Sequence, residues 1–360
     1  MMNFVCVKDY EEKALNLLSP NIRDFFRGGS GEESTLKWNR EAFRKIRILP
    51  RMMRNVKNVD ITTTILGEKV SMPLGISPTA MQKMAHPDGE CANAKAAEAA
   101  GIIYTLSTLS SASIEEVAKA APKCIKWFQI YVFPDRKLTL DLVRRAEKSG
   151  YKALVVTVDS PTAGNRRNEL RNNFKKPPHI KFANLEDYSL ENSFNNNYPY
   201  SLRLDSSLSW KDISWLKKHT SLPIVIKGIL TAEDALLSIK YGANAILISN
   251  HGGRQTDGAP ATIEVLPEIV KAVGEKVEIY VDGGFSQGSD VFKALALGAK
   301  MALFGRPILW ALACEGEKGA KNILEIMKKD IILMFTLTGC RSIKEVTKNM
   351  ICHESKFSRL

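Results

Sequence analysis

The stretch PIVIKGILTAEDALLSIKYGANAILISNHGG, residues 223–253, contains one complete structural repeat. Residues 223–227 form a short run rich in β-branched side chains, as is typical of a buried strand. Residues 231–242 place apolar side chains at the spacing of a helix and end in glycine, a common helix stop. A second apolar run follows at 245–249. Strand, helix and strand in this order predict a β–α–β unit with two parallel strands.

The same alternation continues along most of the chain. Each apolar run is nearly continuous in hydrophobicity, as expected for strands that are covered on both faces. The first run is not followed by the G-x-G-x-x-G motif of dinucleotide-binding open sheets, so a closed barrel is favoured over a doubly wound sheet. The sequence therefore predicts an α/β protein with a (β/α)8 TIM barrel. The predicted strands are Leu74–Ser77, Ile103–Leu106, Lys126–Ile130, Ala153–Thr157, Pro223–Lys227, Ala245–Ser249, Glu278–Val281 and Met301–Phe304.

Three segments lie outside this alternation, although the whole chain is predicted to be a single domain. Residues 1–70 begin with a helical pattern and are interpreted as an N-terminal extension that flanks the barrel of residues 71–350. Residues 172–208, after the fourth strand, are rich in Asn, Ser and Pro and have no sustained period, which predicts a long, mobile lid loop over the barrel mouth. Residues 351–360 form a C-terminal tail.

Composition narrows the possible partners. Basic residues exceed acidic ones by 51 to 39, and the net charge of +12 favours anionic ligands such as small acids and phosphates. No nucleic-acid motif accompanies the charge, the six cysteines lack metal-ligand spacing, and no apolar run is long enough to span a bilayer. We therefore expect no nucleic acid, no metal and no membrane partner.

The chain ends in Ser358-Arg359-Leu360, a close variant of the S-K-L peroxisomal address. This ending predicts a protein of the peroxisomal matrix that is recognised by the import receptor. A chance tripeptide is the alternative interpretation.

Residues that could bind or react with a ligand, most of them polar or glycine, follow the ends of all the predicted strands. In a (β/α)8 barrel the catalytic groups lie at the carboxyl ends of the strands, so these side chains should converge on one mouth. They are Pro78, Thr79, Ala80, Ser107, Gln129, Tyr131, Thr157, Asp159, Lys227, His251, Arg254, Asp282, Gly283, Gly284, Gly305 and Arg306.

Two features of the strand ends bear on the ligand or cofactor that the barrel could bind. The glycines after strands seven and eight, together with Arg306, predict a phosphate site, because backbone N–H groups there can approach an anion closely. Lys227 ends the strand PIVIK and could form a Schiff base, neutralise a phosphate or face a cofactor that gains negative charge.

The loop after the sixth strand suggests acid–base chemistry. His251 can act as a general base near neutral pH, and Asp159 could orient its other ring nitrogen. Arg254 on the same loop could hold a substrate carboxylate. A base and a guanidinium on one loop would bind an acid and remove its proton.

The motifs taken together resemble the FMN-dependent 2-hydroxy acid oxidases, in particular the eukaryotic, peroxisomal branch that includes glycolate oxidase and long-chain 2-hydroxy acid oxidase. The resemblance runs from about residue 5 to the C-terminus. Its most specific motifs are PTAMQKMAHPDGE (78–90), FQIYV (128–132), TVDSP (157–161), KGILTAEDA (227–235), SNHGGRQ (249–255), VDGG (281–284) and GRPILWALACEGE (305–317).

The resemblance implies an FMN enzyme that oxidises an (S)-2-hydroxy acid to the 2-oxo acid and reduces O₂ to hydrogen peroxide, and it implies a homotetramer. A dehydrogenase with another electron acceptor and a flavin-poor, inactive barrel are the alternatives. It assigns His251 as the base and Asp159 as its orienting carboxylate, and it leaves open whether hydride or a proton leaves the α-carbon. It places Tyr131, Arg166 and Arg254 at the substrate. It places Pro78, Thr79, Ala80, Ser107, Gln129, Thr157 and Lys227 at the flavin ring, Asp282 at the ribityl chain, and Gly284, Gly305 and Arg306 at the phosphate; Ser249 and Gly283 are also expected to bind the cofactor.

Three positions depart from the family pattern. Phe25 replaces a substrate-binding tyrosine and Leu109 replaces an aromatic residue, so the substrate site should be more apolar and roomier. These changes predict a preference for medium- or long-chain, or aryl, 2-hydroxy acids over glycolate. Ser286 replaces an arginine of the phosphate site, which predicts weaker retention of FMN.

Overall fold

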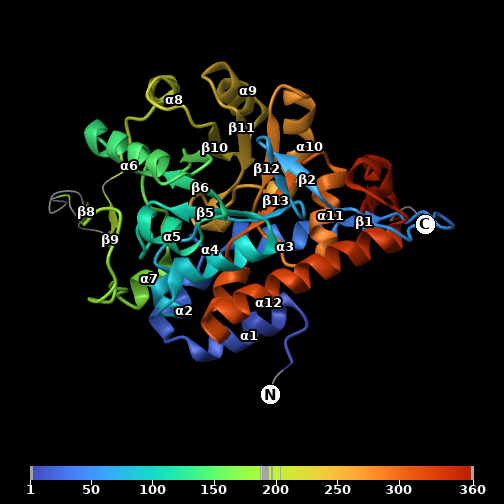
Figure 1. Cartoon of the computed structure of the whole chain (residues 1–360), viewed down its shortest axis with the longest axis horizontal. Coiled ribbons are helices and arrows are strands. Elements are labelled where there is room, and N and C mark those ends of the chain that lie inside the picture. The colour runs from blue at the N-terminus through green and yellow to red at the C-terminus, as the bar shows by residue number, and fades with distance from the viewer. Residues whose placement is uncertain (1–2, 187, 189–193, 196–197, 203, 358–360) are drawn as a thin grey trace.

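The computed structural model describes residues 3–186, 188, 194–195, 198–202 and 204–357. Its centre is a closed barrel of parallel strands in the order β10-β11-β12-β13-β4-β5-β6-β7 (Figure 1). The predicted (β/α)8 fold is therefore confirmed, and each predicted strand lies within two residues of an observed one. The barrel strands are β4 (Leu74–Ile76), β5 (Ile103–Ser107), β6 (Ile125–Ile130), β7 (Ala153–Thr157), β10 (Ile224–Ile229), β11 (Ala245–Ile248), β12 (Glu278–Val281) and β13 (Met301–Phe304).

Helices surround the barrel, and the strands are buried on both faces as their continuous hydrophobicity predicts. The last helix departs from helical geometry at Glu315 and Gly316, where Gly316 has φ +57° and a Cβ would lie 2.7 Å from the His86 ring. The helices that follow the barrel strands are α4 (Gly89–Ala100), α5 (Ile114–Ala120), α6 (Arg136–Lys148), α8 (Trp210–Lys217), α9 (Ala232–Lys240), α10 (Thr262–Val273), α11 (Gly288–Ala296) and α12 (Arg306–Thr338).

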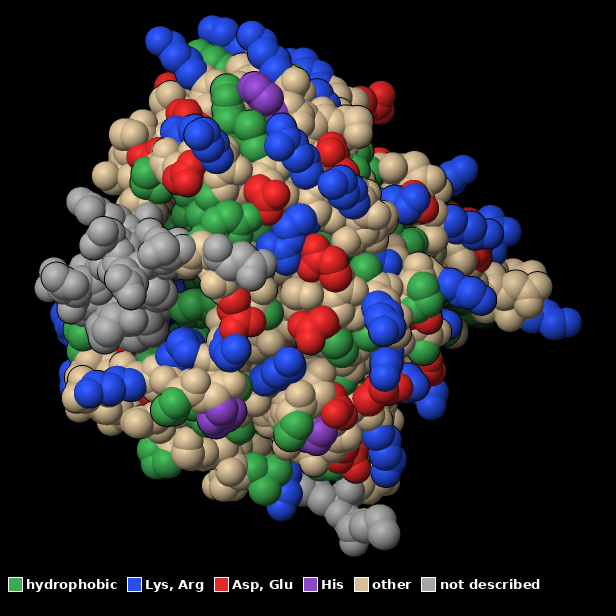
Figure 2. Space-filling model, turned by 60° about the vertical axis from the view of Figure 1, so that its left-hand side comes forward, with side chains coloured by type: hydrophobic (Ala, Val, Ile, Leu, Met, Phe, Trp, Pro, Cys, Tyr) green, Lys and Arg blue, Asp and Glu red, His purple; other side chains and the backbone are tan. Residues whose placement is uncertain are grey.

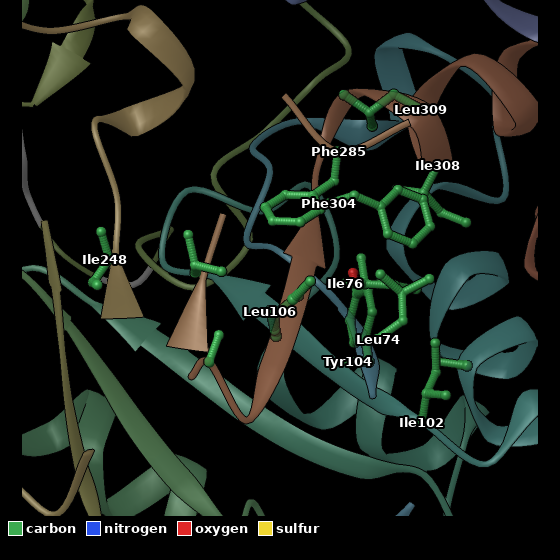
Figure 3. Close-up of a cluster of buried hydrophobic side chains, with 14 of the residues drawn as sticks. Leu74, Ile76, Ile102, Tyr104, Leu106, Ile248, Phe285, Phe304, Ile308 and Leu309 are labelled. Atoms are coloured by element: carbon green, nitrogen blue, oxygen red, sulfur yellow. The ribbon is translucent and has the colours of Figure 1, made fainter. Parts of the chain in front are cut away.

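Buried apolar side chains form two clusters, of which the smaller lies inside the barrel and the larger extends to the surrounding helices. At the amino end of the strands, Ile65 and Val70 of a β-hairpin, β2 (Thr63–Ile65) and β3 (Glu68–Val70), pack with Trp127 and Tyr280. This hairpin closes the bottom of the barrel. The larger cluster includes Leu74, Ile76, Tyr104, Leu106, Phe285, Phe304, Ile308 and Leu309 (Figure 3).

The N-terminal extension contains α1 (Val7–Leu17), α2 (Pro20–Arg27), α3 (Ser34–Arg44) and β1 (Ile46–Ile48). Helix α1 packs beside α12 (Figure 1). Strand β1 pairs antiparallel with β14 (Ile351–His353), so residues predicted to be a plain C-terminal tail contain a strand that is tied to the extension. Ser358-Arg359-Leu360 lies outside the described residues.

The prediction that residues 172–208 are an irregular loop is wrong in part. Strands β8 (Phe194–Asn195) and β9 (Tyr198–Leu202) pair antiparallel within it. These strands are short and their sequence is rich in Asn and Tyr, so no apolar alternation announces them. Residues 187, 189–193, 196–197 and 203 of the predicted lid lie outside the described residues, and its mobility stays a prediction.

The first part of this segment does lie over the barrel mouth. It follows a short helix, α7 (Arg167–Arg171), and buries Phe174 and Phe182. Phe174 stacks on Phe25 of α2 with ring centroids 4.8 Å apart. A lid that covers the mouth therefore joins the extension to the barrel.

The basic side chains on one face of the molecule are dispersed rather than gathered in a single patch. On the face drawn in Figure 2, Lys and Arg side chains lie among Asp and Glu side chains. Within the described residues, no helix has the length and apolar character needed to cross a membrane, and no three potential ligands gather as a metal site would require.

Candidate active site

A cavity opens at the carboxyl ends of the barrel strands and brings together most of the predicted site residues. It is also lined by residues of the N-terminal extension, including Phe25, Phe26, Leu36, Asn39 and Arg40. The predicted residues that line it are Phe25, Pro78, Thr79, Ala80, Ser107, Leu109, Gln129, Tyr131, Thr157, Arg166, Lys227, His251, Arg254, Asp282, Gly283, Gly284, Gly305 and Arg306.

Two predicted residues lie behind this lining. Asp159 is one residue layer back, where its Oδ1 atom lies 2.8 Å from Nδ1 of His251. Ser249 accepts a hydrogen bond from the backbone N–H of His251 at 3.1 Å. Both residues therefore contact residues that line the cavity, among them His251.

The His251 loop has an unusual backbone. His251 has φ +57°, and Gly252 and Gly253 follow with φ +64° and +76°. A left-handed conformation is costly for a residue with a side chain and is typical of functional sites. A Cβ on Gly253 would lie 2.7 Å from the backbone of Leu36, so glycine is required where α3 packs on the loop.

Asp159 lies between two groups that can carry positive charge. Its Oδ1 accepts from Ser160 Oγ at 3.0 Å, and its Oδ2 lies 3.8 Å from Lys227 Nζ. Burial opposes ionisation of this carboxyl, but the charges of Lys227 and His251 outweigh it and hold the pKa of Asp159 well below its usual value. Asp159 is therefore an anion throughout the physiological pH range.

His251 is neutral at pH 7. Its pKa lies below the ordinary value, mainly because burial disfavours the imidazolium; Asp159 acts in the opposite direction, and Lys227 adds to the lowering. Because Nδ1 faces Asp159, Nε2 is the ring nitrogen available to a substrate. Burial also raises the pKa of the nearby Tyr131, which stays a phenol and can donate a hydrogen bond.

Arg166 and Arg254 share one carboxylate. Glu169 of α7 is buried, and its Oε1 lies 3.1 Å from Arg254 Nη2 and 3.4 Å from Arg166 Nη1. Arg254 Nη1 also donates to the backbone oxygen of Phe25 at 2.6 Å, and its guanidinium lies 5.1 Å from the Phe25 ring centroid. Both guanidinium groups line the cavity, so they are available to a ligand that carries a carboxylate.

Arg306 is anchored by backbone oxygens. Its guanidinium donates to Phe26, Gly28 and Gly252, each at 2.9 Å. Burial, followed by the positive charges of Arg254 and Arg40, lowers the pKa of Arg306 to about 9. An anion bound at this end of the cavity would relieve that repulsion.

Side-chain hydrogen bonds connect the ends of strands β5, β6 and β7, which are expected to face the flavin ring. Gln129 donates to Thr157 Oγ1 at 3.0 Å and accepts from Ser107 Oγ at 3.2 Å. Behind the Thr79 loop, buried Glu90 accepts from the backbone N–H groups of Gln82 and Ser111. The loops after β4 and β5 are thereby held in one arrangement.

Asp282 provides a test of fit for a ribityl chain. Its Oδ2 accepts from Ser77 Oγ at 3.3 Å, whereas Oδ1 is buried and has no hydrogen-bond partner within the described residues. Burial raises the pKa of this carboxyl, and Lys227 and Ser249 act in the opposite direction. A buried acceptor without a donor is costly, and a sugar-alcohol hydroxyl would satisfy it. The residues present fit FMN in this respect.

Sequence reasoning did not identify several residues that organise the site. Glu169 follows Arg166 by one helical turn, and this spacing is a signal that could have been used. Asn39 and Asn250 exchange two side-chain hydrogen bonds at 2.8 and 2.9 Å across 211 residues, and no local pattern announces such a pair. Arg40 reaches the cavity from α3 and was also missed.

The fold and the cavity together define a class of protein. It is a (β/α)8 barrel whose cavity brings a histidine–aspartate pair together with two arginines at the carboxyl ends of the strands.

Comparison with known proteins places the chain within that class. Residues 14–353 match the family model described as FMN-dependent dehydrogenase. The chain is 48% identical to 2-hydroxyacid oxidase 1 of Homo sapiens over 355 residues, covering 96% of each protein. It is 47% identical to glycolate oxidase of Spinacia oleracea over 355 residues, covering 97% of this chain and 96% of that one. A crystal structure of mandelate oxidase with benzoyl-formic acid superposes with a TM-score of 0.88 at 41% identity, covering 96% of this chain and 97% of the other.

The chain therefore belongs to the FMN-dependent dehydrogenase family, among the 2-hydroxy acid oxidases. The resemblance seen in the sequence motifs is confirmed, and FMN is the cofactor of this enzyme.

Proposed function

We propose that this enzyme oxidises an (S)-2-hydroxy acid to the 2-oxo acid and passes the electrons through FMN to O₂, releasing hydrogen peroxide. The observation that carries the proposal is the meeting of the His251–Asp159 pair and the Arg166–Arg254 pair in one cavity. The first pair removes a proton and the second binds a carboxylate, so a 2-hydroxy acid satisfies both. The relatives named as oxidases support the same conclusion.

Each group of side chains has its own role in this proposed reaction. Arg166 and Arg254 bind the substrate carboxylate bidentately, and Tyr131 donates a hydrogen bond to the substrate. Neutral His251 accepts a proton at Nε2, and Asp159 stabilises the imidazolium that forms. FMN supplies the acceptor for the two electrons that leave the substrate.

We infer that the cofactor is held by three parts of the cavity. The strand ends at Thr79, Ser107, Gln129 and Thr157 face the ring, with Lys227 supplying positive charge. Asp282 accepts from the ribityl hydroxyls through its unpaired Oδ1. The glycines after β12 and β13, with Arg306, hold the phosphate, and Ser286 supplies no charge there, which predicts weaker retention of FMN.

The substrate end of the cavity favours an apolar tail. Phe25, Met81, Leu109 and Phe182 line it, and Phe25 offers no hydroxyl group where it meets Arg254. Burial of each methylene group of the ligand against an apolar wall stabilises the complex by roughly 0.8 kcal/mol. We therefore propose medium- or long-chain aliphatic, or aryl, 2-hydroxy acids as better substrates than glycolate; the structural likeness to mandelate oxidase favours the aryl case.

One anaerobic experiment tests the reaction. The holoenzyme is mixed with a 2-hydroxy acid from a panel that runs from glycolate to 2-hydroxypalmitate and includes mandelate, and the flavin absorbance is followed before and after oxygen is admitted. Bleaching by long-chain or aryl acids, then recovery in oxygen with stoichiometric peroxide, is the expected result. Recovery with a dye or quinone but not with oxygen would establish a dehydrogenase, and no flavin absorbance after addition of FMN would indicate an inactive barrel.

Location and assembly also remain proposals. We propose import into peroxisomes through Ser358-Arg359-Leu360 and assembly as a homotetramer. Fluorescence of a protein tagged at its N-terminus, with and without the last three residues, tests the first, and sedimentation of the holoenzyme tests the second.

A further inference from the structure

Gly283, Gly284 and Gly305 form one end of the cavity, called here the glycine-lined end. Helix α3 of the N-terminal extension faces it. A Cβ on Gly284 would lie 2.1 Å from the backbone oxygen of Asn39, and a Cβ on Gly283 would lie 3.4 Å from the Asn39 side chain. The next residue, Arg40, lines the same cavity as Gly283, Gly284 and Arg306. Helix α3 therefore presents a cation where the cofactor phosphate is expected.

The basic residues that line the cavity differ in how they are neutralised. Lys227 lies near Asp159, and the Arg166–Arg254 pair shares buried Glu169. Arg306 is held by backbone oxygens and has no acidic partner among the described residues within salt-bridge distance. Arg40 pairs with Glu11. Of these two guanidinium groups, only that of Arg40 has a carboxylate within salt-bridge distance among the described residues.

The geometry of the Arg40–Glu11 pair leaves Arg40 able to bind a second anion. Both contacts, at 2.7 and 2.9 Å, are made by the same nitrogen, Nη2. Nη1 and Nε are not used in this pair, and they lie on the other edges of the planar guanidinium. The Arg40 side chain is 49% exposed, whereas that of Glu11 is 17% exposed, so the carboxylate fixes the guanidinium from the α1 side.

The loop after β12 offers backbone groups at this end but no positive charge. Residues 282–290 contain no lysine or arginine. The N–H and hydroxyl groups of Ser286 both donate to Asp290 Oδ2, at 3.0 and 3.3 Å. A dianionic phosphate seated here must draw its cations from other elements. Among the described basic residues that line the cavity, Lys227, Arg166 and Arg254 lie near Asp159 or Glu169, whereas Arg306 and Arg40 do not.

We propose that Arg40 is the second phosphate-binding cation of this enzyme, held ready by Glu11 and acting beside Arg306 on the FMN phosphate. The proposal rests on FMN being the cofactor, and it assigns a cofactor role to a residue outside the barrel. It requires that Arg40 contributes to binding of FMN but not of riboflavin, which has the same ring and ribityl chain without the phosphate.

The test measures the dissociation constants of FMN and riboflavin by quenching of flavin fluorescence in apoprotein prepared from three proteins: wild type, Arg40→Met and Arg44→Met. Arg44 is the matched control because it is an exposed residue at the end of the same helix and does not line the cavity. A charge-assisted contact is worth roughly ten- to a hundredfold in affinity. Arg40→Met should weaken FMN binding by about that factor and leave riboflavin binding unchanged.

Two further readouts separate a phosphate contact from a structural effect. The decrease of FMN affinity with added salt should be less steep in Arg40→Met than in wild type, because one cation is lost. Arg40→Lys should recover part of the lost affinity. Equal loss for FMN and riboflavin, or FMN affinity in Arg40→Met equal to that of Arg44→Met, would overturn the proposal while leaving the proposed oxidase function intact. Wild-type protein that binds neither flavin would overturn both.

Discussion

Nδ1 of His251 lies 2.8 Å from Oδ1 of Asp159, and the two residues come from loops that follow different strands, β11 and β7. This contact fixes the ring so that Nε2 serves the substrate, and it gives the imidazolium a neighbouring anion. The histidine is nevertheless kept neutral at pH 7, because burial lowers its pKa. These properties suit the general base that we propose: the ring is neutral before it accepts a proton, and the neighbouring anion stabilises it afterwards.

Replacing His251 by Gln should abolish the reductive half-reaction without removing the cofactor. We expect the rate of flavin bleaching by substrate to fall by roughly 10²–10⁴-fold, because general base catalysis is lost. FMN should remain bound, since the strand ends and the phosphate site are unchanged. Stopped-flow absorbance on the anaerobic holoenzyme measures the rate, and an unchanged rate would exclude His251 as the base.

The pH dependence of flavin reduction should follow the charge of His251. The rate requires the neutral ring, so activity is lost as the pH falls through the pKa of His251, which lies below the ordinary value of about 6.5. In Asp159→Asn the anion that raises this pKa is gone, so the acidic limb should move to lower pH while the plateau rate falls. A limb that moves to higher pH would contradict the assigned electrostatics.

Substrate preference should respond to Phe25 and Leu109. Restoring a hydroxyl and a bulky ring with Phe25→Tyr and Leu109→Trp narrows the apolar end and adds a donor beside Arg254. The ratio of kcat/KM for glycolate over 2-hydroxypalmitate should rise by roughly 10–200-fold in the double variant, the range expected for changes of one or two contacts in a pocket. A ratio unaltered by both changes would place chain-length selection elsewhere.

Adding charge at position 286 should tighten FMN binding. Ser286→Arg keeps the hydrogen bond from the backbone N–H of residue 286 to Asp290, and it places a guanidinium near the glycine-lined end. We expect about tenfold stronger FMN binding and no change for riboflavin. If Arg40 also contacts the phosphate, the gain should be larger in an Arg40→Met background, and fluorescence titration of the double variant measures this coupling.

Gly284 should tolerate no side chain. It has φ +87°, and a Cβ would lie 2.1 Å from the Asn39 backbone oxygen. Gly258 has φ +90° with nothing within 4 Å, so Gly258→Ala is a control for the backbone strain alone. We expect Gly258→Ala to lower the free energy of unfolding by about 1–2 kcal/mol and Gly284→Ala by about 3 kcal/mol or more, measured by urea denaturation. Similar values for both would mean that the α3 contact relaxes freely.

The sequence predicts the barrel well because its strands are buried on both faces, so each appears as an apolar run such as Ala153–Thr157, which β7 matches residue for residue. The residues at the strand ends were found for the same reason, since the fold rule places them at one mouth. Contacts between distant segments were not found. Glu169, Asn39 and Arg40 act through partners that only the folded chain brings near.

The paired amides of Asn39 and Asn250 join the segment before the barrel to the loop that carries His251. The same segment supplies the oxygens of Phe25, Phe26 and Gly28 that fix Arg254 and Arg306. The barrel therefore does not contain a self-sufficient reaction centre. A chimera that joined this barrel to the N-terminal segment of another protein would keep His251 and the arginines but lose the contacts that position them. The first 44 residues and the loop after β11 must therefore be exchanged together.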